Sequence, residues 1–204
     1  MIIDPASALP VDVYRLMIGA IVPRPIAFVS TRSPDGILNL APFSFFTAVS
    51  ANPPVICFSP MISGRDGGRK DTLSNIEITR EFVVNVVSED IIQQVNICST
   101  EFPPEVDEFE ASGLTPIPSD IVTPPRVKES RINMECRLLQ IVHVSTKPLG
   151  GSLVLGEVLR FHIDDRVFEN HRIEPDKLCP IGRMGGPTYV RTTDRLNIER
   201  QTLK

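Results

Sequence analysis

The sequence predicts a mainly β fold in which antiparallel strands outnumber helices. Strand-like apolar runs bounded by turn residues dominate the chain, and two pairs of these runs are joined by tight-turn sequences. No regular alternation of strands and helices appears, as a parallel sheet covered by helices would require. A chain of 204 residues is large enough to bury its own core, so a single domain over 1–204 is the simplest organisation.

The first hairpin is predicted around the sequence SPDG. Apolar runs at 25–30 and 37–41 flank it, and its four residues have proline second and glycine last, as a type I turn favours. The following runs, 55–59 and 81–87, are rich in β-branched residues and bounded by turn residues. We therefore expect a hairpin followed by two further strands.

The second hairpin is predicted late in the chain. Two long runs, 131–145 and 152–163, are joined by the sequence PLGG. Strands of this length can curl around a barrel. This pair is the strongest sign that the sheet is curved.

Helical patterns are few and short. An amphipathic segment lies at 11–19, a second helix is expected at 71–80, and a third at 90–98 has an apolar face. The acidic, proline-rich segment 101–125 then precedes the long hairpin. We interpret it as a solvated excursion, with a lid over a binding site as the alternative.

Composition excludes several classes of partner. The 21 basic and 25 acidic residues give a net charge of -4 without a long block of one sign, which argues against nucleic acid. No apolar run is long enough for a membrane span, and no signal peptide is apparent. The four cysteines are widely spaced without a Cys-x-x-Cys motif, so we expect no metal site and a cytoplasmic location.

The common catalytic motifs are missing. The sequence has no dinucleotide-binding glycine fingerprint after a strand, no Walker loop, no nucleophile elbow and no His-Glu-x-x-His. The three histidines have no acidic partner at short range in the sequence. A hydrolase that uses a catalytic triad is therefore not indicated.

The loop SPMISGRDGGRKDTLSNI, residues 59–76, has the composition of a phosphate site. Glycines free its backbone amides just before a helix start, and its cations are Arg65, Arg69 and Lys70. We expect Asp71 to cap the helix, which leaves Thr72 and Lys70 to face an anion, while Arg69 points elsewhere. The alternative is a solvated basic turn.

The first hairpin has the composition of a flavin site. Four small polar residues lie among apolar residues that favour burial: Ser30, Thr31, Asn39 and Ser44. They could contact the polar edge of a flavin ring, and Phe43, Phe45 and Phe46 would supply apolar walls. Phe45 and Phe46 are adjacent, so in a strand only one of them can line a pocket. Hydride transfer to a flavin needs alignment with a nicotinamide more than an acid–base pair, which fits the missing motifs.

At the level of whole motifs, the sequence resembles the flavin reductase-like proteins, which include the flavoredoxins. The resemblance runs from about Val22 to Asp194 and is carried by RPIAFVST, NLAPFSFFTAVSANPP, KDTLSNI, EFVVNVV, LGEVLRFHIDD and PIGRMGGPTYVRTTD. It implies an FMN-binding split β-barrel, antiparallel and of about six strands, with a few flanking helices.

The resemblance also implies site residues. The flavin ring would lie against the backbone of Pro25, Ile26, Ala27, Ala41, Phe45 and Phe46, with Asn39 and Ser44 as side-chain partners. The ribityl or phosphate groups would be held by Thr31, Ser59, Lys70 and Thr72, with Arg65 as a further candidate. His162 would lie beside the nicotinamide, and the backbone of Gly185 and Gly186 would pass close to the site.

The implied function is reduction of flavin by NADH or NADPH. One alternative is an electron carrier with bound FMN that has no nicotinamide site, and another is a non-redox barrel that binds a small ligand or a partner. The resemblance implies a homodimer, because a second chain would cover sheet edges and exclude water from the flavin. Electrons would pass on to a redox protein or a monooxygenase.

Overall fold

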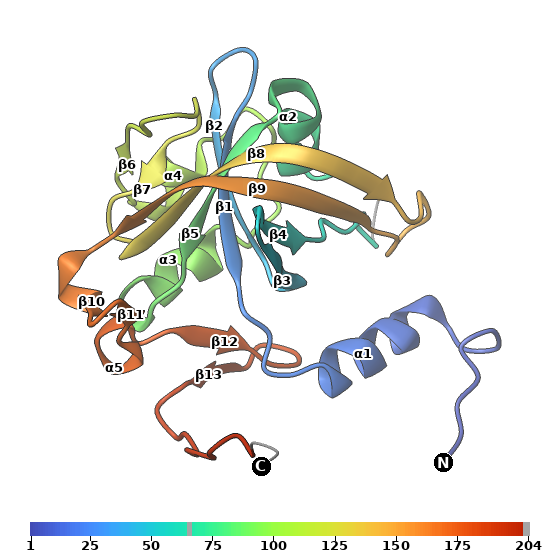
Figure 1. Ribbon diagram of the computed structural model, residues 1–204. Coiled ribbons are helices and arrows are strands. Elements are labelled where there is room, and N and C mark those ends of the chain that lie inside the picture. The colour runs from blue at the N-terminus through green and yellow to red at the C-terminus, as the bar shows by residue number, and fades with distance from the viewer. Residues whose placement is uncertain (65–66, 202–204) are drawn as a thin grey trace.

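The computed structural model describes residues 1–64 and 67–201 (Figure 1). In these residues the main sheet has seven strands in the order β2-β1-β5-β8-β9-β4-β3, and every neighbouring pair is antiparallel. The strands are β1 (Ala27–Arg32), β2 (Leu38–Phe43), β3 (Phe46–Ala51), β4 (Pro54–Phe58), β5 (Glu81–Val86), β8 (Ile132–His143) and β9 (Ser152–Ile163). The mainly β, antiparallel fold class is confirmed.

The remaining elements are short and lie around this sheet. The helices are α1 (Pro10–Ala20), α2 (Asp71–Thr79), η1 (Glu89–Ile91), α3 (Ile92–Ile97), α4 (Glu108–Ser112), η2 (Asp165–Val167) and α5 (Pro175–Leu178). Three two-stranded ribbons pair β6 (Pro116–Ile117) with β7 (Arg126–Val127), β10 (Phe168–Glu169) with β11 (Arg172–Ile173), and β12 (Ile181–Arg183) with β13 (Tyr189–Arg191). None of the helices in the described residues is long and apolar enough to cross a membrane.

Both predicted hairpins are present. In the first, the Gly36 amide donates to the Ser33 carbonyl at 3.0 Å, and Gly36 has a φ of 94° that glycine adopts without strain. In the second, β8 and β9 pair along their whole length, from Ile132 with Ile163 to His143 with Ser152. Figure 1 shows these two long, curved strands crossing the molecule side by side.

The sheet curls around one apolar core. Strands β1, β2, β4, β5, β8 and β9 all contribute to a single buried cluster, which the α2 residues Leu73 and Ile76 close. The edge strands β2 and β3 are joined by Ser44 and Phe45 alone, and within the described residues no ladder pairs them. The barrel is therefore open, or split, at this point.

The acidic segment after α3 is only in part the solvated excursion that the sequence suggested, because its helix is packed on the sheet. Its helix α4 packs on the outer side of β2 and buries Glu108, Phe109 and Ser112, and Phe109 joins a second apolar cluster with Phe28. The Asp107 carboxylate accepts from the Phe109 amide at the start of α4, and Gly113 ends it with a φ of 73°. The sequence DEFEASG thus forms a capped helix that is anchored by the buried Phe109 ring and by the hydrogen bonds of Glu108.

Candidate functional site

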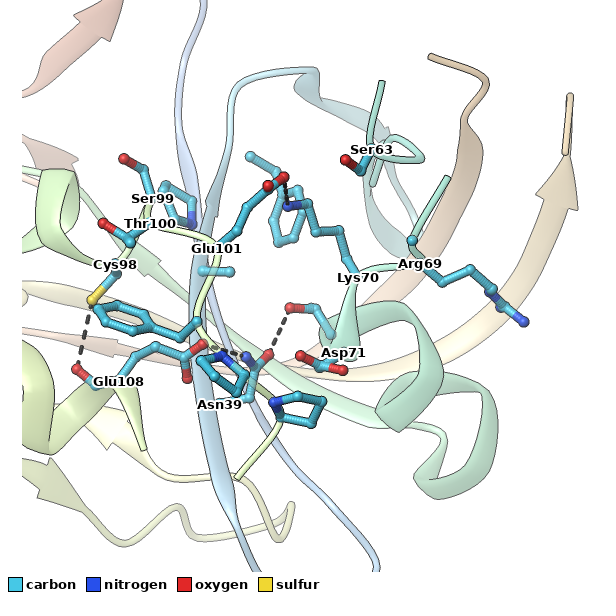
Figure 2. Close-up of a pocket in the computed structure, with 18 residues that line it drawn as sticks. Asn39, Ser63, Arg69, Lys70, Asp71, Cys98, Ser99, Thr100, Glu101 and Glu108 are labelled. Carbon is cyan, nitrogen blue, oxygen red and sulfur yellow. Dashed lines mark hydrogen bonds and ion pairs between the residues drawn. The ribbon is translucent and has the colours of Figure 1, made fainter. Parts of the chain in front are cut away.

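A pocket of about 420 Å³ lies where the start of α2, strand β2 and the segment after α3 meet (Figure 2). Its described wall comprises Asn39, Ala41, Pro42, Phe43, Ser63, Gly68, Arg69, Lys70, Asp71, Thr72, Cys98, Ser99, Thr100, Glu101, Phe102, Pro103, Pro104 and Glu108. The segment 98–104 therefore forms one side of the pocket. Residues 101–104 of the acidic segment belong to this wall, and a role of the segment as a lid stays a prediction.

The structure separates the two adjacent cations at the helix start. The Lys70 ammonium lies across the pocket, with Nζ 3.1 Å from Glu101 Oε1. The Arg69 guanidinium instead turns outward, and its Nη2 lies 2.5 Å from Glu77 Oε1 on α2. Figure 2 shows Lys70 reaching toward Glu101 and Arg69 extending away from it.

The prediction that Asp71 caps α2 is wrong. The N-cap residue is Lys70, which makes no side-chain capping bond, and Asp71 is the first residue of the helix. The Leu73 and Ser74 amides both donate to the Lys70 carbonyl, at 3.0 and 3.3 Å. The helix start that faces the pocket is therefore uncapped by a side chain, and its positive dipole end is available to an anionic group.

A buried polar network forms the floor of the pocket. Asn39 Oδ1 accepts from the hydroxyls of Thr31 (3.1 Å) and Thr72 (2.6 Å). Asn39 Nδ2 donates to Glu108 Oε1 at 2.9 Å, and the Leu40 amide donates to Glu108 Oε2 at 3.0 Å. The network ties α2, β1, β2 and α4 together behind the pocket wall.

Glu108 is the residue of this network that sequence reasoning missed. It is 7% exposed, and burial raises the pKa of its carboxyl, while the hydrogen bonds from Leu40 and Asn39 act in the opposite direction. The capping aspartate and terminal glycine that flank its helix were the available signal. They predict a short helix, but the partner that holds Glu108, Asn39, lies 69 positions away in the chain.

Some of the predicted site residues share this pocket and others do not. Those on its wall are Asn39, Ala41, Lys70, Asp71 and Thr72. Thr31 is fully buried behind it, and its Oγ1 also accepts from Asn75 Nδ2 at 3.0 Å. Ile26 and Ala27 are buried, Phe46 packs against the barrel core, and Ser59 donates its amide to the Phe45 carbonyl. Arg65 lies outside the described residues.

A second group of predicted residues gathers around Arg24, which the sequence gave no reason to select. Its guanidinium is buried and donates to the carbonyls of Ile18 (2.7 Å), Ile21 (2.7 Å) and Met184 (3.0 Å) and to Ser44 Oγ (3.2 Å). It also lies over the Phe45 ring, 5.9 Å from its centroid. Burial lowers the pKa of Arg24.

Arg24 brings distant parts of the predicted site together. Ser44 and the GRMGG segment approach the same guanidinium, and a Cβ on Gly185 would lie 3.7 Å from the Ile18 carbonyl oxygen. The pocket holds 41–43 and the Arg24 group holds Ser44 and Phe45, which follow directly in the chain. The end of β2 therefore runs between the pocket that Lys70 lines and this polar group.

His162 lies elsewhere, in a groove over β8 and β9. Its Nε2 is 2.5 Å from Oε1 of Glu135, which is fully buried and also accepts from the amides of Asp120 (2.9 Å), Ile121 (2.6 Å) and Val122 (3.0 Å). Burial alone would raise the pKa of Glu135, but these hydrogen bonds outweigh it and lower the pKa to about 2. A nicotinamide-side role for His162 stays a prediction.

The side chains of Asp120, Glu135 and His162 place possible metal-ligand atoms within 4.8 Å of one another. Each carboxylate is already engaged, Glu135 by three amides and Asp120 by Arg160 at 2.7 Å. The cluster therefore anchors the segment at 120–122 to the sheet.

Comparison with known proteins decides the family. The Flavin reductase like domain matches residues 18–180. The chain belongs to the flavin reductase-like family. The resemblance carried by the sequence motifs is confirmed. The pocket and Arg24 itself lie within the matched region, while Met184 and Gly185 lie just beyond its end.

Three solved structures are similar to this chain along nearly its whole length. Nitrilotriacetate monooxygenase component B from Bacillus cereus is 36% identical, with a TM-score of 0.92 over 97% of this chain and 98% of that chain. Pseudomonas fluorescens 2-nitrobenzoate 2-nitroreductase NbaA is 32% identical, with a TM-score of 0.89 over 99% and 97%. A putative flavin reductase with a split barrel domain from Shewanella frigidimarina, 22% identical, has a TM-score of 0.83 over 98% and 100% and supports the split-barrel fold.

Proposed function

We propose that this protein binds FMN and reduces flavin with NADH or NADPH. The observation that carries the proposal is the pocket at the start of α2, where the Lys70 ammonium and an uncapped helix start meet the end of β2. A cation beside a helix N-terminus is a suitable place for a phosphate. Membership of the flavin reductase-like family supplies the class of ligand.

The residues present fit FMN at both ends. For the phosphate, Lys70, the α2 start and the Thr72 hydroxyl lie on one wall. For the ring, the end of β2 offers extended backbone from Ala41 to Phe43, followed by Ser44 beside Arg24. When bound, FMN would supply the electron-accepting chemistry, and the chain would hold the phosphate and orient the ring.

The proposed reaction is hydride transfer from NADH or NADPH to flavin. Hydride transfer depends on alignment of the two rings more than on an acid–base pair. In this proposal the cation and hydroxyls of the pocket hold the flavin in place for that alignment. Among the relatives, a flavin reductase from Pseudomonas putida is 32% identical over 108 residues, 53% of this chain. The Bacillus cereus structure is a monooxygenase component, so we extend the proposal to a monooxygenase or another redox protein as electron acceptor.

The deciding experiment has two steps. First, the purified protein is titrated into FMN, and quenching of FMN fluorescence is expected. Second, the FMN-loaded protein is mixed rapidly with NADH and then NADPH without oxygen, and loss of flavin absorbance is expected with at least one of them. Binding without bleaching would favour the electron carrier, and the absence of binding would favour a non-redox barrel.

We also propose a homodimer in the cytoplasm. Among the described residues, α1 has none that is buried, and Leu16 and Met17 on it are 47% and 46% exposed. A second copy that covered this helix and the split edges would remove apolar surface and unpaired strand edges from water. The four cysteines are free thiols, which suits a reducing compartment.

A further inference from the structure

Glu101 forms an ion pair with Lys70, the cation that we propose binds the flavin phosphate. Its Oε1 lies 3.1 Å from Lys70 Nζ, and both side chains line the pocket. They come from opposite sides of the pocket, Lys70 from the start of α2 and Glu101 from the segment after α3 (Figure 2). The ion pair therefore bridges the space into which an anionic ligand would enter.

The other carboxylates on the described wall are held in different ways. Glu108 is fixed by Asn39 and the Leu40 amide on the side of β2. Asp71 stands in the first turn of α2, where the helix dipole favours a negative charge. Among the carboxylates on the described wall, Glu101 is the one that pairs with Lys70.

The Lys70–Glu101 pair is weak enough to be displaced. The two side chains are 35% and 49% exposed, and exposed ion pairs contribute little to stability because water and salt screen them. A phosphate carries more charge and more acceptor oxygens than a carboxylate. Building on the proposed function, we infer that Glu101 competes with the FMN phosphate for Lys70 and so keeps FMN exchangeable.

The test compares Glu101→Gln with Glu105→Gln. Glu105 lies in the same segment, is exposed and is not on the described pocket wall, so its variant makes the same change of net charge without freeing Lys70. FMN and riboflavin Kd values are measured by fluorescence quenching. Glu101→Gln is expected to lower the Kd for FMN about three- to tenfold. The Kd for riboflavin, which has no phosphate, should stay unchanged. Glu105→Gln should change neither.

A double-mutant cycle isolates the competition. If Glu101 acts through Lys70, Glu101→Gln gives no gain in FMN affinity when Lys70 is already alanine. The inference is overturned if Glu101→Gln tightens FMN no more than Glu105→Gln does, or if it tightens riboflavin equally. If wild-type protein binds neither flavin, the proposed function fails first, and the inference fails with it.

Discussion

Lys70 and Arg69 are adjacent in the sequence, yet their side chains have different surroundings. Lys70 stands at the N-cap position with extended backbone, which directs its side chain across the pocket to Glu101. Arg69 lies along the outside of α2 and pairs with Glu77. Position relative to the helix start, rather than charge, decides which cation can serve a ligand.

Truncating Lys70 should weaken the binding of FMN and leave the binding of riboflavin nearly unchanged. Lys70→Ala removes one charge-assisted hydrogen bond to the phosphate, so FMN affinity is expected to fall about ten- to a hundredfold while riboflavin affinity hardly changes. Fluorescence titration of both flavins measures this. Arg69→Ala is the matched control and should leave both affinities near wild type. Equal weakening of FMN and riboflavin by Lys70→Ala would refute the phosphate assignment.

Glu135 should make the free energy of unfolding depend on pH in the acidic range. Its pKa is lowered from 4.5 to about 2, so the carboxylate stabilises the fold above pH 4.5, and this contribution is lost as the pH falls toward 2. Glu135→Gln should lower the free energy of unfolding at pH 7 by about 2–3 kcal/mol, because buried amides lose a charged acceptor. The variant should also lose less further stability on acidification.

Urea denaturation at a series of pH values between 7 and 2 tests the Glu135 prediction. Glu110→Gln provides the control, since Glu110 is an exposed acid on α4 and its removal should leave the acid dependence intact. Parallel pH profiles for wild type and Glu135→Gln would contradict the assignment.

At the scale of elements, the short helices α2 and α4 are held to the sheet by polar side chains as well as apolar ones. Asn39 on β2 bonds Thr72 of α2 and Glu108 of α4. A similar arrangement holds the segment before β8, where Ser30 donates to the Pro125 carbonyl at 2.5 Å. The small polar residues of the first hairpin therefore position neighbouring segments.

Close packing inside the barrel leaves no room for a side chain at position 156. A Cβ on Gly156 of β9 would lie 2.3 Å from Cζ of Phe82, which is fully buried and cannot move aside. Gly156→Ala should therefore destabilise the protein by about 1–3 kcal/mol. At Gly19 in α1 an added Cβ would meet no atom of the described residues within 4 Å, so Gly19→Ala should instead stabilise the protein by roughly 0.5–1 kcal/mol. Thermal unfolding of both variants checks this pair; a similar loss in each would contradict it.

Patterns within a segment predicted the main strands and helix α2, but they could not predict contacts between residues far apart in the sequence. The two hairpins, the long strands and α2 follow from turn residues and periodicity within each segment. Arg24 was missed because its partner Met184 lies 160 positions away, and Glu108 because Asn39 lies 69 positions away. Strand β3 was missed because five of its six residues are exposed, so it has no apolar alternation.

At the scale of the whole molecule, α1 projects from the barrel (Figure 1). Arg24 holds the C-terminal end of α1 by hydrogen bonds to the carbonyls of Ile18 and Ile21. Leu16 and Met17 of the same helix remain exposed to water. A helix held at one end with its surface uncovered is suited to pack on another chain.

The homodimer can be tested through this helix. Wild-type protein is expected to sediment as a dimer, and Met17→Asp should shift it toward monomer and weaken FMN binding, because a charge would enter the proposed contact. Arg15→Ala, on the same helix with a side chain 69% exposed, is the control and should stay dimeric. A wild-type monomer with undiminished FMN affinity would count against the dimer.

The strand order also has a consequence for synthesis of the chain. β5 pairs with β8 and β4 pairs with β9, so the late hairpin is inserted between strands made much earlier. β9 reaches β4 through Val154 to Glu157, so until these residues have been made no strand of the described sheet joins the pair β4-β3 to the strands β2, β1, β5 and β8. A truncation before β9 will therefore yield an incomplete and exposed sheet, and the barrel forms only after most of the protein has been made.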